Sequence, residues 1–237
     1  MTLNQLIKEL RRNILRDTSD ATSVDEDDLL WTDEALAMYI NEAYFRFCHL
    51  TEYLQDASTP SVCYLTLVVG QREYDLDPAV IRILSAEHGN IILPVTSTDH
   101  LHGDQSEIAS YQSVRRSDYP GVYAVVPDYQ IGKIVIAGTP TSEDVVNPLR
   151  FRVSRYPLEK LTLDNANAEP EIPERFQLDM IEWAAFRALR NHDADGENMA
   201  KASAHSTRFE RAVEEVKSEF KMRKFSRINY TESWGWN

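Results

Sequence analysis

Residues 31–54 read WTDEALAMYINEAYFRFCHLTEYL, and their periodicity predicts an amphipathic helix. Thr32 suits the N-cap, and Asp33 and Glu34 follow in the first turn, where the helix dipole favours negative charge. The apolar stripe consists of Leu36, Ile40, Ala43, Phe47, Leu50 and Leu54, preceded by Trp31 in the position of a hydrophobic staple. Aromatic residues at positions 39, 44, 45 and 53 widen the stripe. We therefore expect this helix to bury more than one face, inside its own chain or against a neighbour.

Helical patterns also occupy the two ends of the chain. Thr2 can cap a first helix, whose stripe is Leu3, Leu6, Ile7, Leu10, Ile14 and Leu15. Pro173 suits the first turn of a third helix, whose stripe is Phe176, Met180, Ile181, Ala184, Ala188 and Leu189. The pattern breaks near His192–Gly196. A last helix follows, with the stripe Ala202, Phe209, Val213, Val216 and Phe220.

The middle of the chain, from Val62 to about Tyr156, has short β-prone runs between turn residues. The expected strands are Val62–Val69, Glu73–Leu76, Val80–Leu84, Ile91–Val95, Gly121–Val126, Lys133–Ala137 and Leu149–Val153. Short strands at this spacing are typical of an antiparallel sandwich or a small barrel.

This order of patterns predicts an α+β fold. Neither pair of helices buries its stripes alone, so we expect the N- and C-terminal helices to form one bundle with the β module inserted between its halves. The expected boundaries are residues 1–58 and 170–225 for the bundle, 59–160 for the antiparallel β-sandwich or barrel-like module, and 226–237 for an extended C-terminal tail.

Composition narrows the classes of function. Hydrophobic residues make up 43% of the chain and charged residues 27%, which indicates a globular protein. The formal net charge of −13 argues against a free-standing DNA-binding role, because an acidic surface repels phosphate. No apolar run approaches the roughly 18–20 residues of a membrane span, and charged residues from Lys8 onward interrupt any signal peptide. Synthesis in the cytoplasm, with Cys48 and Cys63 reduced and buried, is expected.

Candidate metal and catalytic patterns fail on spacing. The acidic run Asp25–Asp28 fits a solvated loop, because consecutive carboxylates repel one another. His192–Glu197 resembles a calcium loop, but its glycine comes at the fourth position and Ala204 replaces the glutamate expected at the twelfth. His100 and His102 have no supporting second ligand group nearby. With no catalytic motif either, the sequence predicts no catalytic, cofactor-binding or metal-binding residue, and not an enzyme.

The C-terminal end is the candidate interaction site. Basic residues dominate from Lys217 to Arg227, which fits either a solvated helix face or a tail that docks on an acidic partner. The aromatic residues that follow would be costly if exposed, so they fold back onto the chain or are buried in a partner. The candidate docking residues are Lys221, Arg223, Lys224, Phe225, Arg227, Ile228, Tyr230, Trp234 and Trp236.

Several of these segments resemble the head-to-tail adaptors (connectors) of tailed bacteriophages. Trp31–Leu36 with Tyr39–Ala43 is similar to the family's second helix, and Gly70–Asp77 is similar to its G-x-x-x-Y-x-L turn and strand. Looser matches are Tyr119–Tyr123 with Ile134–Ile136, the single-proline Gly138–Pro140, and Ile172–Phe176 leading into Trp183–Ala185. The resemblance covers most of the chain.

The resemblance implies a virion structural protein in the neck of the particle. It implies a homo-oligomeric ring beneath the portal protein, twelve-fold to match the portal, that also contacts a downstream tail or nozzle protein. DNA would meet it only in transit through the lumen during ejection, and neither a cofactor nor a membrane is implied. Like charge around an acidic lumen would let the phosphate backbone slide.

Other functions fit the same sequence. A head-completion or tail-terminator protein would differ in its ring partner, and co-purification with portal or with tail tube separates these two from the adaptor. A soluble enzyme or host-directed effector predicts a compact monomer with a deep pocket. A non-specific DNA-binding protein is supported by the basic C-terminal end alone.

Overall fold

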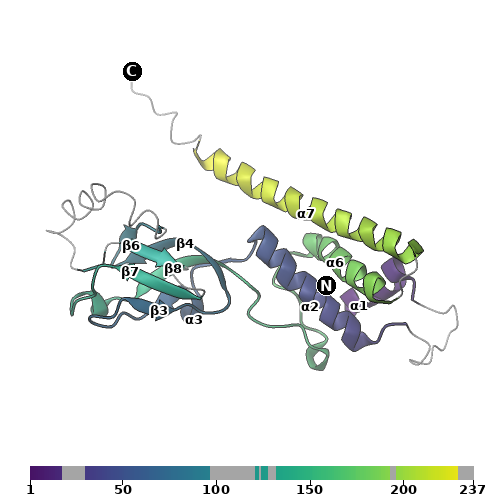
Figure 1. Ribbon diagram of the computed structural model, residues 1–237, viewed down its shortest axis with the longest axis horizontal. Helices are drawn as coiled ribbons and strands as arrows, with labels where there is room; N and C mark the ends of the chain where they lie inside the picture. Colours follow the sequence, from purple (N-terminus) through teal and green to yellow (C-terminus); the bar gives the residue numbers. More distant parts are fainter. Residues whose placement is uncertain (18–29, 97–120, 123, 128–131, 193–195, 229–237) are drawn as a thin grey trace, which may run out of the picture. The chain divides into compact units, whose positions relative to one another are not determined.

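The computed structural model describes residues 1–17, 30–96, 121–122, 124–127, 132–192 and 196–228, with only the backbone for 191–192, 196–198 and 223–228. The contacts divide the chain into two compact units. The helical unit comprises Met1–Tyr53 and Pro157–Asn237, and the β unit comprises Leu54–Tyr156. The predicted α+β class is confirmed, because helices and antiparallel sheets both form (Figure 1).

Five helices and a short turn make up the described part of the helical unit. These are α1 (Leu3–Glu9), the π-helix η1 (Leu10–Leu15), α2 (Asp33–Thr51), the 3-10 turn η4 (Leu163–Asn165), α6 (Glu174–His192) and α7 (Gly196–Ile228). Both predicted threonine caps are confirmed. Thr2 forms a capping box with Gln5, and the Thr32 hydroxyl accepts a hydrogen bond from the Ala35 N–H. The first helix differs from the prediction, because its second half is a π-helix in which Ile14 and Leu15 are only half-buried.

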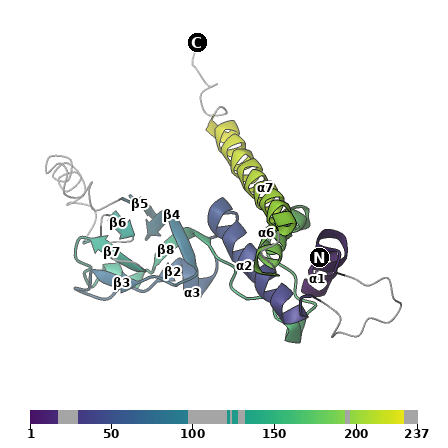
Figure 2. The same cartoon turned by 45° about the vertical axis from the view of Figure 1, so that its right-hand side comes forward.

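The core of the helical unit is aromatic and joins segments from both ends of the chain. Phe47 of α2 is fully buried, with ring centroids 6.1 Å from Phe176 of α6 and 6.4 Å from Phe209 of α7. Tyr53 lies 5.2 Å from Phe176, and Trp183 lies 5.4 Å from Phe209. Figure 2 shows α2, α6 and α7 side by side within this unit. The aromatic excess of the Trp31–Leu54 stretch is therefore largely accounted for by packing within the chain.

In the β unit, two antiparallel sheets form among the described residues. The strands are β1 (Gln55–Asp56), β2 (Tyr64–Leu65), β3 (Glu73–Asp75), β4 (Val80–His88), β5 (Ile91–Leu93), β6 (Ala124–Pro127), β7 (Lys133–Ala137) and β8 (Leu149–Arg155). One sheet has the order β1-β8-β4-β5, with β2 also paired to β8, and the other has the order β3-β7-β6. Two short helical segments lie between strands of this unit: α3 (Pro60–Cys63) comes between β1 and β2, and η3 (Asp144–Val146) between β7 and β8. Alternate side chains of both sheets meet in a common core, which includes Ile83, Val125, Ile134, Phe151 and Val153.

The expected strand over Val62–Val69 is wrong for most of its length. Pro60 begins the short helix α3, which buries Val62 and Cys63, and only Tyr64–Leu65 pairs as a strand. Val68 and Val69 are exposed in the loop that follows. The Tyr74 hydroxyl fixes this loop, accepting from the Val68 N–H at 3.0 Å and lying 2.9 Å from the Gln71 carbonyl, to which it can donate. Backbone pairing is thus replaced by a side chain from β3.

Candidate docking interface

Helix α7 extends beyond the bundle at its C-terminal end. The Arg175 guanidinium, in the first turn of α6, lies 3.1 Å from the Glu219 carboxylate of α7, and Tyr53 lies 5.4 Å from the neighbouring Phe220. The residues after Phe220 therefore continue past the start of α6, as Figures 1 and 2 show. The eight residues from Lys221 to Ile228 add about 12 Å of helix at the usual rise.

The predicted docking residues lie on or beyond this extension. Lys221 is exposed, and so is the adjacent Met222, whose exposed fraction is 69%. The backbone of α7 includes Arg223, Lys224, Phe225, Arg227 and Ile228. Residues 226–228, which the sequence prediction assigns to the extended tail, are thus helical. Cations in the last turns of a helix also favour its dipole. Tyr230, Trp234 and Trp236 lie outside the described residues.

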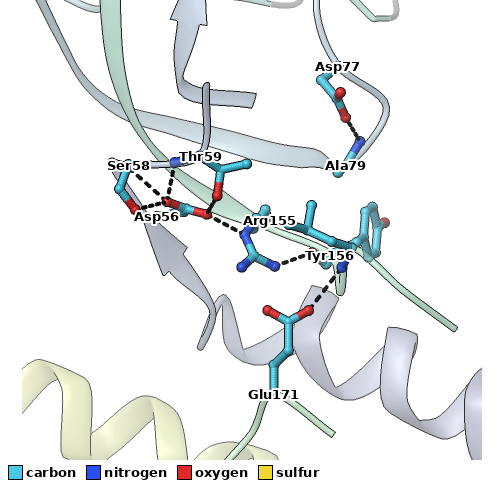
Figure 3. Close-up of polar contacts among 9 residues, drawn as sticks. Asp56, Ser58, Thr59, Asp77, Ala79, Arg155, Tyr156 and Glu171 are labelled. Carbon is cyan, nitrogen blue, oxygen red and sulfur yellow. Dashed lines mark hydrogen bonds and ion pairs between the residues drawn. The ribbon is translucent and has the colours of Figure 1, made fainter. Parts of the chain in front are cut away.

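A buried ion pair that the sequence did not reveal lies where the chain enters and leaves the β unit (Figure 3). Arg155, the last residue of β8, donates from Nε to the Asp56 carboxylate of β1 at 2.8 Å. Ser58 and Thr59 complete the carboxylate's shell: the two backbone N–H groups donate at 2.8 and 3.1 Å and the Thr59 hydroxyl at 2.6 Å. Below, we call Asp56, Ser58, Thr59 and Arg155 the polar clamp.

The polar clamp sets the ionisation of its own carboxylate. Burial alone would raise the pKa of Asp56, but the hydrogen bonds from Thr59, Ser58 and Arg155 outweigh it and hold this pKa well below its ordinary value. Burial of the nearby Cys63, together with the Asp56 charge, raises the pKa of the Cys63 thiol. The thiol is therefore protonated and unreactive, as expected for a buried structural cysteine.

The polar clamp lies where the entering and leaving strands of the β unit, β1 and β8, meet. The Arg155 N–H donates to the Leu54 carbonyl at 2.9 Å, and Gln55 and Asp56 pair with Ser154 and Val153. The entering and leaving strands are therefore hydrogen-bonded to each other at the point where the insertion begins and ends. This arrangement is structural: it fixes the ends of an inserted unit, and it presents no exposed nucleophile or base.

The described residues form no metal site. No group of three or more His, Cys, Asp or Glu side chains among them is arranged to hold a metal ion. The acidic run Asp25–Asp28, the pair His100 and His102, and most of the calcium-loop-like stretch lie outside the residues or side chains that are described. No described helix is both long enough and apolar enough to cross a membrane.

One family model matches the chain, and it spans residues 1–229, covering both units. Its description is "SU10 adaptor protein". The chain belongs to the SU10 adaptor protein family. No curated protein matches the chain at a significant level.

Membership of the SU10 adaptor family confirms the resemblance to phage head-to-tail adaptors. The protein is a phage structural protein with a role at the junction of head and tail. Such an adaptor is associated with portal and tail components, and its place is in the virion.

The structure explains one of the motifs behind the resemblance to phage adaptors. In Gly70–Asp77, Gly70 has a φ of +79°, a conformation that favours glycine, and Tyr74 fixes the preceding loop. In this motif, Gly70 and Tyr74 therefore serve the backbone turn and the loop before the strand.

Proposed function

We propose that this adaptor assembles as a homo-oligomeric ring beneath the portal, twelve-fold to match it, and joins the capsid to a downstream tail or nozzle protein. DNA passes through the lumen without being gripped. The net charge of −13, repeated around a ring, supports this passage, because the phosphate backbone then meets like charge.

The observation that carries the docking part of the proposal is the extension of α7. This extension carries four basic residues, Lys221, Arg223, Lys224 and Arg227. The backbone of this helix end continues beyond the bundle, whereas the preceding part of α7 packs on α6 and α2. We propose that this end, with the aromatic residues beyond it, binds the portal.

The test is negative-stain microscopy of the protein mixed with its portal. A second ring beneath the portal is expected for the wild type. Deleting residues 226–237 should abolish that ring, and unchanged binding of the shortened chain would contradict the docking proposal.

A charge-only variant separates the basic residues from chain length. R223Q/K224Q/R227Q should weaken binding to the portal. The matched control, R208Q/R211Q/K217Q, removes the same number of charges from the packed part of the same helix. The control should bind as the wild type does; equal weakening by both variants would mean that net charge, and not this end, governs binding.

A further inference from the structure

The outer face of the larger sheet of the β unit carries arginines. Leu149, Phe151 and Val153 of β8 point into the core, so Arg150 and Arg152 lie on the opposite face. Across the strands, Arg150 pairs with Tyr64 on one side and Glu87 on the other, and Glu87 pairs with Ile92. Below, the arginine face means Arg150, Arg152, Tyr64 and Ile92, with Arg82 one register further along β4.

The arginine face is exposed and partly pre-organised. Ile92 has an exposed fraction of 73% and Tyr64 of 38%, and Arg150 and Arg152 are exposed. The Arg150 guanidinium lies 5.7 Å from the Tyr64 ring centroid, and Arg152 donates to Gln55 at 2.6 Å. A guanidinium stacked on a ring keeps its N–H donors in its own plane, where a carboxylate can accept them. Arginine, tyrosine and exposed apolar side chains are the residue types that form binding interfaces.

The helical unit carries a surface of opposite charge. Residues 157–173 join β8 to α6 with no regular element except η4, a long connection of the kind that often has a binding role. This acidic segment, as we call it, contains Glu159, Asp164, Glu169 and Glu171 against one basic residue, Lys160. Glu159, Asp164 and Glu169 are exposed.

The acidic segment is held rigidly on the bundle. The Asn41 side chain brackets it, donating to the Leu161 carbonyl at 2.7 Å and accepting from the Leu161 N–H at 2.9 Å. The first turn of α1 adds two bonds, from the Leu3 and Asn4 N–H groups to carbonyls of the segment at 3.0 Å. The Tyr44 hydroxyl accepts from the Glu171 N–H at 2.6 Å. The carboxylates are therefore presented on a fixed backbone, which lowers the entropic cost of binding.

We propose that the arginine face of one copy binds the acidic segment of a second copy. This inference rests on the proposed ring, and it names the contact between neighbours. Each copy would use two different surfaces, one for each neighbour, and such a heterologous contact closes into a ring when its rotation fits. Two copies each carrying −13 repel overall, so a local match of opposite charges is what would fix their register.

The test is a charge exchange, read as the number of adaptor copies bound per portal. The face-reversed variant is R150E/R152E, and the segment-reversed variant is E159R/E169R. Each variant alone should bind at least about tenfold fewer copies per portal than the wild type, because like charges then meet at every contact. An equimolar mixture should recover the ring, since each reversed surface finds its complement on the other variant and alternation closes a ring of even copy number.

The control K8E/R12E changes net charge by the same amount as R150E/R152E, at exposed positions of α1 and η1, and should assemble normally. Normal assembly of R150E/R152E, or a loss that the segment-reversed copy does not repair, would overturn the contact while leaving the ring intact. Absence of a ring with the wild type would instead contradict the proposed function itself, and the contact with it. If R150E/R152E does not fold by circular dichroism, R150Q/R152Q replaces it and should bind severalfold fewer copies per portal than the wild type, and no loss would overturn the contact.

Discussion

Each of the two units of this adaptor is stabilised internally by a different kind of interaction. In the helical unit, rings from α2, α6 and α7 meet in one cluster around Phe47. In the β unit, the core is built mainly from aliphatic side chains, and the polar clamp of Asp56 and Arg155 connects the entering and leaving strands. The difference follows from chain order. A bundle made from both ends of a chain is closed by packing, whereas an inserted unit must also have its entering and leaving strands fixed.

The sequence provides a way to follow the two units separately. The β unit, residues 54–156, contains no tryptophan, and Trp31 and Trp183 lie in the described part of the helical unit. Tryptophan fluorescence in urea therefore reports on that unit, and NMR signals from the β4 and β8 amides report on the other.

The largest effect is expected in the aromatic cluster. Phe47→Ala removes a fully buried ring and leaves a cavity between three helices, which should cost about 3–5 kcal/mol of unfolding free energy. The tryptophan transition should shift to lower urea, while the β4 and β8 signals persist. Met38→Ala on the same helix is the control, since Met38 has an exposed fraction of 57% and should change little. A matching loss of the β signals would show that the two units unfold as one.

Weakening the polar clamp should destabilise the β unit and leave the helical unit unchanged. Asp56→Asn keeps the shape of the side chain but removes the anion beside Arg155, and breaking a buried pair on one side costs about 3 kcal/mol. The β4 and β8 signals should disappear at lower urea, with the tryptophan transition unchanged. Asp75→Asn, at a carboxylate whose side chain is 88% exposed, should leave both signals in place. Equal urea transitions for the two variants would mean that β1–β8 backbone pairing alone holds the entering and leaving strands together.

The pH dependence of that difference follows from the lowered pKa of Asp56. A carboxyl group whose folded pKa is depressed contributes stability above its unfolded pKa, and loses it as pH falls through the folded one. The gap in urea midpoint between wild type and Asp56→Asn should stay constant from pH 8 to about 5, and narrow below about pH 4, the ordinary aspartate value. A gap that stays constant from pH 5 down to pH 2 would show that the Asp56 pKa is not depressed.

Helix periodicity and caps could be predicted from sequence, because their signals are local. Thr32 caps α2 and Leu36, Ile40, Ala43 and Phe47 are buried as predicted, whereas Leu50 is half-buried and Leu54 lies beyond the end of α2 at Thr51. Strand β7 has the expected bounds, Lys133–Ala137. The prediction over Val62–Val69 is wrong because Pro60 starts a short helix despite the β propensity of Val62, and because the Tyr74 hydroxyl fixes Val68 in a loop.

The polar clamp could not be predicted, because its partners are far apart in sequence. Asp56 and Arg155 are 99 residues apart, and each alone is an ordinary charged residue. Only the Asp-x-Ser-Thr spacing before Pro60 hinted that the Asp56 carboxylate would accept local backbone bonds. The arginine face and the acidic segment likewise depend on strand register and on long-range bonds.

The smallest predicted effects come from one hydroxyl in each unit. Tyr44 of the helical unit and Tyr74 of the β unit are both buried, and each accepts a hydrogen bond from a loop N–H, of Glu171 and Val68 respectively. Tyr→Phe at either position leaves that N–H without its acceptor, at a cost of about 1–2 kcal/mol. Tyr44→Phe should move the tryptophan transition alone, and Tyr74→Phe the β4 and β8 signals alone. Tyr64→Phe is the control, because its side chain lies on the exposed sheet face. If Tyr74→Phe costs as little as this control, the Val68–Gln71 loop is held by its backbone turn, and the side chain that replaces strand pairing there contributes nothing to stability.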